Sequence, residues 1–154
     1  MDKKTESRLH TFEWVVVAAI FITFLFIAIP TIREYRYNSR VIAAISQMIQ
    51  IEDNILYYKQ RFNRLPTSLD ALDLGQLKDP WGNVFQYRLL SNTPVAAERH
   101  PSRKGQFQLS LNDDYDLFSM GPDGKTAESL LHDGGRDDII RANNGAFIGL
   151  ASEY

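Results

Sequence analysis

The stretch that decides the fold is HTFEWVVVAAIFITFLFIAIPTIREY, residues 10–35. Between residues 14 and 29 it contains one polar residue, Thr23. Counted from residue 12 to residue 32, the segment reaches the length of about 20 residues that a helix needs to cross a bilayer. The apolar block does not end in the small-residue cleavage site of a secretory signal. We therefore expect a retained membrane-spanning helix.

Basic residues on both sides of this segment bear on its orientation. Lys3, Lys4 and Arg8 precede it, whereas Arg33 and Arg36 follow it and weaken the asymmetry. Positive charge favours the cytoplasmic side of a membrane helix. We expect the N-terminus in the cytoplasm and the rest of the chain on the other side of the membrane.

The apolar pattern continues beyond the membrane segment. Apolar residues recur there at spacings of three, four and seven, which are typical of one stripe along a helix. These residues are Ile32, Tyr35, Val41, Ile42, Ile45, Met48, Ile49, Ile55, Leu56 and Tyr58. No glycine occurs before Gly75, so we expect one helix over about residues 11–62. Pro30 removes one backbone hydrogen bond and is expected to kink or loosen that helix.

The remainder of the chain has the pattern of a small sheet. The turn sequence DPWGN at residues 79–83 leads into a strand-like segment at 84–89. Two more strand-like segments follow at 107–111 and 115–120. Short strands with hairpin-length connections favour an antiparallel sheet, one face of which could receive the helix. The predicted fold class is α+β, with a long N-terminal helix packed on a small antiparallel sheet.

Composition excludes several functions. The net charge of −2 provides no basic stripe for nucleic acid, and the absence of cysteine excludes disulfide and thiolate chemistry. No GxSxG, GxGxxG, phosphate-loop or HExxH motif occurs. We therefore expect a protein that is not an enzyme and does not bind nucleic acid.

Several motifs together point to a known family. If Leu9 is position one, Glu13 is the fifth residue and Pro30 the twenty-second. Four further motifs follow in order: YYKQRFNRLPTSLDAL, DPWGNVFQY, YDLFSMGPDGK and GGRDDI. In these positions the chain resembles the type IV pilin superfamily, and within it the major pseudopilins of type II secretion systems. The resemblance covers nearly the whole chain and implies a pilin-like fold.

The resemblance implies a structural role. Such a chain is a subunit of a type II secretion pseudopilus, or of a related type IV pilus-like filament, that assembles through its N-terminal helix to support protein secretion. Glu13 and Pro30 would be its assembly residues. Its partners would be further copies of itself or other pseudopilins, and the assembly platform of the bacterial inner membrane. The protein would be single-pass, with a periplasmic C-terminal domain. The expected parts are a basic leader (residues 1–8), the membrane half of the helix (9–32) and a head with the amphipathic half-helix, sheet and acidic C-terminal loop (33–154).

The leader departs from the family pattern. Family members have glycine before the bond that prepilin peptidase cleaves, and the new N-terminal amine is then methylated; here Arg8 and Leu9 occupy the candidate processing site. One alternative is therefore an unprocessed, membrane-anchored periplasmic module that does not polymerise. Three roles stay open for Glu13: a carboxylate at the membrane interface, a partner for a cation of an adjacent subunit, or a residue recognised by the assembly platform.

The loop over residues 119–139 is rich in aspartate and glycine. Carboxylate and carbonyl oxygens are the ligands of Ca²⁺, but the spacing is not that of an EF-hand, and composition alone favours a solvated acidic loop. The resemblance implies calcium binding in this loop. The matching residues are Ser119, Met120 through its carbonyl, Asp123, Asp137 and Asp138.

Overall fold

The computed structural model describes residues 3–90, 103, 110–127, 129–130 and 132–154. The chain divides into two units, Met1–Ser39 and Arg40–Tyr154. The second unit contains the C-terminal part of the long helix and all of the strands, and is called the head unit below.

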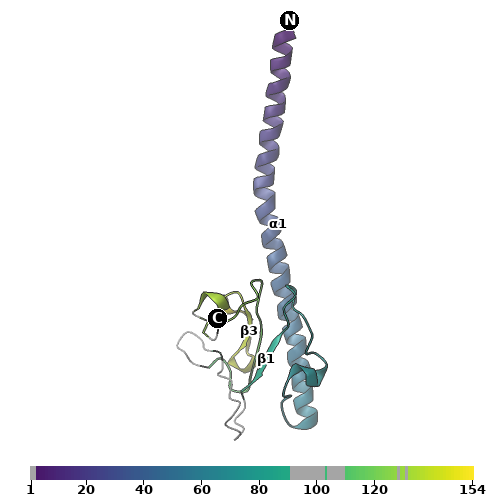
Figure 1. The fold of residues 1–154 in the computed structure, drawn as a ribbon, viewed down its shortest axis with the longest axis vertical. Helices are drawn as coiled ribbons and strands as arrows, with labels where there is room; N and C mark the ends of the chain where they lie inside the picture. The colour runs from purple at the N-terminus through teal and green to yellow at the C-terminus, as the bar shows by residue number, and fades with distance from the viewer. Residues whose placement is uncertain (1–2, 91–102, 104–109, 128, 131) are drawn as a thin grey trace. The chain divides into compact units, whose positions relative to one another are not determined.

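The first element is one long helix, α1, which spans Lys3–Phe62 (Figure 1). It begins before the expected residue 11 and ends at the expected residue 62. Its end is set by Asn63, which adopts a left-handed conformation with φ of 53°. Pro30 lies inside the helix, and the backbone is helical on both sides of it. Because proline has no amide hydrogen, the carbonyl of Phe26 loses its helical partner.

The head unit contains a four-stranded antiparallel sheet. The strands are β1 (Gln86–Leu89), β2 (Tyr115–Ser119), β3 (Ile139–Ala142) and β4 (Phe147–Leu150), in the order β1-β2-β3-β4. The short 3-10 helices are η1 (Leu69–Leu72), η2 (Asp133–Gly135), η3 (Asn143–Gly145) and η4 (Ala151–Glu153). The predicted α+β class is confirmed.

The strands differ from the expected three. The segments expected at 84–89 and 115–120 contain β1 and β2, whereas the segment expected at 107–111 falls largely on residues 104–109, outside the described residues. Strands β3 and β4 were not predicted. Each is only four residues long, and η3 joins them closely, so neither shows an extended alternating pattern.

Both faces of the sheet are covered. Tyr115 and Leu117 lie on one face of β2, because side chains alternate along a strand, and the hydroxyl of Tyr115 reaches Glu52 of α1. On the other face, Phe118 and Ile140 are paired across β2 and β3. They form a second hydrophobic cluster with Leu111, Leu130, Ala142 and Ala151. The sequence had predicted only the face that receives the helix.

The expected apolar stripe of α1 is buried along one side and exposed along the other. The head unit buries Val41, Ala44, Met48, Ile51 and Ile55. The side chains of Ile42, Ile49 and Leu56 stay 65%, 47% and 42% exposed. Successive residues of a helix are about 100° apart, so these three face roughly 120° away from the centre of the buried set. The apolar stripe therefore extends beyond the part of the helix circumference that the head unit covers.

Candidate functional site: the N-terminal helix and the acidic loop

Glu13 and Pro30, the two expected assembly residues, lie on α1 in the first unit. They are separated along the helix axis by about 25 Å at 1.5 Å per residue. The helix contains an 18-residue window with a mean hydropathy of 2.8, none of it buried in the structure, and is long and apolar enough to cross a membrane. The candidate processing residues Arg8 and Leu9 lie in the first turns of the same helix. Their processing and the role of Glu13 stay predictions.

The acidic loop begins at Ser119, the last residue of β2. Its hydroxyl donates to Oδ2 of Asp79 across 2.5 Å and accepts from the amide of Gly121 across 3.1 Å. Oδ1 of Asp79 accepts from the amides of Trp81 and Asn83, and the side-chain amide of Asn83 donates to the carbonyl of Gly121 at 2.8 Å. The DPWGN turn therefore holds the start of the loop through hydrogen bonds from both of its ends.

The middle of the loop is folded back on itself. The Oδ1 atom of Asp123 accepts from the amide of Lys125 at 2.7 Å, and the amide of Asp123 lies 3.4 Å from Oδ2 of Asp137. Gly121 has a φ of 61°, and a Cβ atom built on it would lie 2.3 Å from the carbonyl oxygen of Asp137. The two ends of the loop thus meet at a place where only glycine fits.

Asp138 lies at the far end of the loop and is buried. Its Oδ2 atom accepts from Nη2 of Arg103 at 2.5 Å and from the hydroxyl of Thr126 at 2.7 Å. Burial raises the pKa of Asp138 to about 6, and the Arg103 guanidinium opposes this rise. The carboxylate forms a buried ion pair with Arg103.

The described donors do not fit a calcium site. Calcium takes about six to eight oxygens. Across the described part of the chain, no group of three or more His, Cys, Asp or Glu side chains is placed to hold a metal ion. Of the residues expected to bind calcium, Ser119 donates its hydroxyl to Asp79, and Asp138 accepts from a guanidinium. Calcium binding stays a prediction that a direct measurement has to decide.

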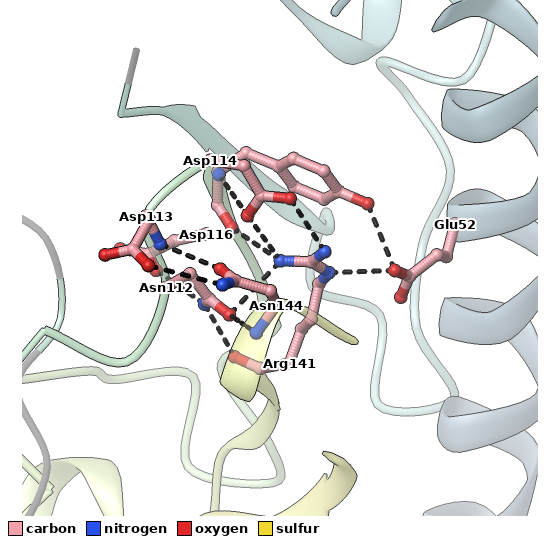
Figure 2. A network of polar contacts seen from close by, with 8 residues as sticks. Glu52, Asn112, Asp113, Asp114, Asp116, Arg141 and Asn144 are labelled. Carbon is pink, nitrogen blue, oxygen red and sulfur yellow. Dashed lines mark hydrogen bonds and ion pairs between the residues drawn. The ribbon is translucent and has the colours of Figure 1, made fainter. Parts of the chain in front are cut away.

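A second polar network lies on the face of the sheet that meets α1. Arg141 of β3 is buried, and Figure 2 shows it pointing toward Glu52 of α1. Its Nε donates to Oε1 of Glu52 at 2.9 Å, and its Nη1 and Nη2 donate to the two oxygens of Asp114 at 2.8 and 3.0 Å. The guanidinium carbon lies 3.9 Å from the centroid of the Tyr115 ring. One arginine thus joins the helix, the start of β2 and β3.

The remaining contacts of Arg141 complete this network. Nη1 also donates to Oδ1 of Asn112 and to the carbonyl of Tyr115, both at 3.1 Å. Burial alone would lower the pKa of Arg141, but its hydrogen bonds to Asp114 and Glu52 outweigh burial and raise the pKa. All three nitrogens of the group therefore have partners, which a buried charge requires.

Sequence reasoning did not single out Arg103, Arg141, Glu52 or Asp79 as site residues. Arg103 pairs with a residue 35 positions away and Arg141 with one 89 positions away. An arginine in a polar segment is usually exposed, so composition offered no signal for these pairs. Only Asp79 had a local signal, because an aspartate at the start of a turn commonly accepts from the amides that follow it.

Comparison with known proteins shows similarity to a protein of a bacterial secretion system. No family model matches the chain, and no solved structure does. The chain is 29% identical over 146 residues to the type II secretion system core protein G of Aeromonas hydrophila. The alignment covers 81% of this chain and 89% of that relative.

Proposed function

We propose that the protein is a structural subunit of a type II secretion pseudopilus, or of a related type IV pilus-like filament, that supports protein secretion. Helix α1 would anchor it in the bacterial inner membrane as a single-pass protein with a cytoplasmic N-terminus and a periplasmic head. The similarity to a core protein of a type II secretion system supports this role. The membrane-length apolar segment at the start of α1 is consistent with it.

The observation that carries the proposal is the bare apolar face of α1 in the head unit. Ile42, Ile49 and Leu56 are seven residues apart and are all exposed. Lipid can cover the apolar surface of a membrane segment, but these residues belong to the unit that also contains the folded sheet. A seven-residue repeat of large aliphatic side chains is the pattern by which helices pack along one another. We assign this face to the helix of a neighbouring copy of the chain.

Glu13 would act in the same assembly. A carboxylate in a low-dielectric bundle of helices is stabilised by a cation close to it. If the chain is processed before Leu9, the new α-amine of an adjacent subunit, methylated as in the family, supplies that cation. If it is not processed, Arg8 or a lysine of the neighbour takes this place. In both cases the contact forms only on assembly at the inner-membrane platform, with copies of itself or with other pseudopilins.

A second candidate function is favoured by one observation. Arg8 stands where pilin-like chains have glycine. A chain that keeps its leader could remain a membrane-anchored periplasmic module that does not polymerise. The intact mass and N-terminal sequence of the protein from its native membrane distinguish processed from unprocessed chains.

The proposed function is tested by Glu13→Gln in the native host. We expect the variant to insert into the membrane in normal amounts but to be absent from sheared filament fractions and from cross-linked oligomers. Glu34→Gln is the matched control, because it removes the same charge from the same helix outside the proposed contact. It should assemble as the unchanged protein does. Normal assembly of Glu13→Gln would refute the role of Glu13, and absence of oligomers from the unchanged protein would refute the filament subunit itself.

A further inference from the structure

We propose that the guanidinium of Arg103 is the built-in cation of the acidic loop, and that the head unit closes this loop without calcium. This reverses the expectation from the family resemblance. The inference concerns the fold of the head unit and does not rest on the proposed filament function.

The first support is the ion pair between Arg103 and Asp138. The two side chains are 3% and 0% exposed, and Nη2 of Arg103 lies 2.5 Å from Oδ2 of Asp138. Asp138 is the residue at which the downstream end of a calcium site was expected. A metal ion at this carboxylate would either have to displace the guanidinium from Oδ2 or bind Oδ1 directly beside it.

The second support is the fit of the pocket around the guanidinium. Nη2 also donates to the carbonyl of Ala127 at 3.2 Å, and the guanidinium carbon lies 4.3 Å from the centroid of the Phe118 ring. A Cβ atom on Gly135 would lie 3.3 Å from Nη2, closer than an ordinary contact. The pocket therefore has a polar wall, an aromatic wall and a glycine where the arginine needs room.

The third support is the backbone of Arg103. Its amide donates to Oδ2 of Asp116 on β2 at 2.8 Å, and its carbonyl accepts from the amide of Leu111 at 2.9 Å. Asp116 is itself buried and held by the side chain of Asn112 at 2.9 Å. The main chain at Arg103 is thus fixed against the sheet, which keeps its side chain directed at Asp138.

The fourth support is electrostatic. Oδ1 of Asp138 and the Nε and Nη1 atoms of Arg103 are buried without hydrogen-bond partners among the described residues. A divalent cation bound at Oδ1 would lie close to the guanidinium and would be repelled in a low-dielectric pocket. The unpartnered Oδ1 atom of Asp138 is therefore not a favourable binding site for a divalent cation. Arginine, which stays charged at any pH that the fold experiences, already supplies the positive charge.

The test is thermal unfolding of the full-length chain in detergent micelles, followed by near-ultraviolet circular dichroism. We expect the Tm to change by less than about 1 °C between excess EGTA and about 10 mM calcium. A calcium site with a Kd near 0.1 mM would be about 100-fold saturated at that concentration and would raise the Tm by roughly 10 °C. A rise of that size would overturn the proposal, whatever the variants below show.

Variants test the arginine itself. Arg103→Leu leaves Asp138 buried without its partner, and we expect the Tm to fall by about 10 °C or more. Arg136→Leu is the matched control, an exposed arginine of the same loop, and should change the Tm by less than about 2 °C. The double variant Arg103→Leu with Asp138→Leu should recover part of the loss, because the unpaired charge is gone. Equal Tm values for Arg103→Leu and Arg136→Leu would contradict the proposal. If Arg103→Leu does not fold, the calcium titration of the unchanged chain still decides the question.

Discussion

Arg141 of β3 donates a hydrogen bond from Nε to Oε1 of Glu52 on α1 across 2.9 Å, joining residues 89 positions apart (Figure 2). Tyr115 donates from its hydroxyl to the same oxygen at 3.2 Å. One carboxylate of the helix thereby binds both β2 and β3. Hydrophobic packing is not directional, so the buried apolar residues of α1 alone do not fix how the helix is oriented on the sheet. The hydrogen bonds to Glu52 require one orientation.

Removing this carboxylate should weaken the head unit. Glu52→Ala leaves the Nε atom of Arg141 buried without an acceptor, so we expect a loss of about 1–3 kcal/mol in the free energy of unfolding. Asp53→Ala is the control, because Asp53 is the next residue of the helix and is exposed. It should cost less than about 0.5 kcal/mol. Urea unfolding of the full chain in micelles measures both, and equal losses would contradict the assigned role of Glu52.

Two adjacent residues, Met48 and Ile49, test which side of the apolar stripe the head unit covers. Met48 is fully buried, so Met48→Ala should cost about 2–5 kcal/mol of unfolding free energy. Ile49 is 47% exposed, and Ile49→Ala should cost less than about 1 kcal/mol in the isolated chain. The same urea experiment distinguishes them. A larger loss for Ile49 would mean that the head covers a different face of α1.

Two glycines test how the acidic loop closes. Gly121 and Gly82 both have positive φ, 61° and 99°, so replacement by alanine strains both by about 1–2 kcal/mol. Only at Gly121 would the new Cβ atom overlap the carbonyl of Asp137, whereas nothing lies within 4 Å at Gly82. We expect Gly121→Ala to cost about 1–3 kcal/mol more than Gly82→Ala. Comparable losses would show that the loop ends do not meet there.

Stability at alkaline pH depends on Tyr115, which is buried, and Tyr87, which is half-buried. Burial raises the pKa of Tyr87 and of Tyr115 above the ordinary value of 10.0. Below pH 10 both groups are neutral in the folded and unfolded chain, and stability is fully present. Above it the unfolded chain loses these protons while the folded chain keeps them, so stability falls as pH rises.

Absorbance at 295 nm during an alkaline titration measures this effect. Tyr87 and Tyr115 should ionise well above pH 10, together with unfolding. Tyr87→Phe should reduce the late phase. Titration of all seven tyrosines in one phase near pH 10 would show that neither residue is protected.

The features that sequence predicted well are those with local signals. The helix up to Phe62 follows from a long periodic pattern without glycine, and the α+β class follows from the change of pattern after it. The DPWGN turn was also predicted, and Gly82 donates from its amide to the carbonyl of Asp79 at 3.0 Å. In each case neighbouring residues alone determine the local conformation.

The features that sequence missed depend on contacts between distant residues. Which apolar residues of α1 are buried depends on where the sheet lies, so Ile42 and Ile49 could not be separated from Val41 and Met48 by hydrophobicity. The partner of Asp138 was missed for the same reason, since Arg103 reaches it only in the folded chain. The resemblance implied calcium in the acidic loop and gave no indication that Arg103 contacts Asp138.

Photo-cross-linking in the native host tests most directly whether copies of the chain pack through the bare face of α1. A photoreactive benzoylphenylalanine would replace Ile49, and in a control chain it would replace Asn54, which is exposed on another face. We expect cross-linked products at multiples of the chain mass for position 49 and few or none for position 54. If position 49 cross-links only to a different protein, the exposed face of α1 binds that protein and not another copy of the chain. Equal yields from both positions, or no products at position 49, would contradict the filament-subunit account.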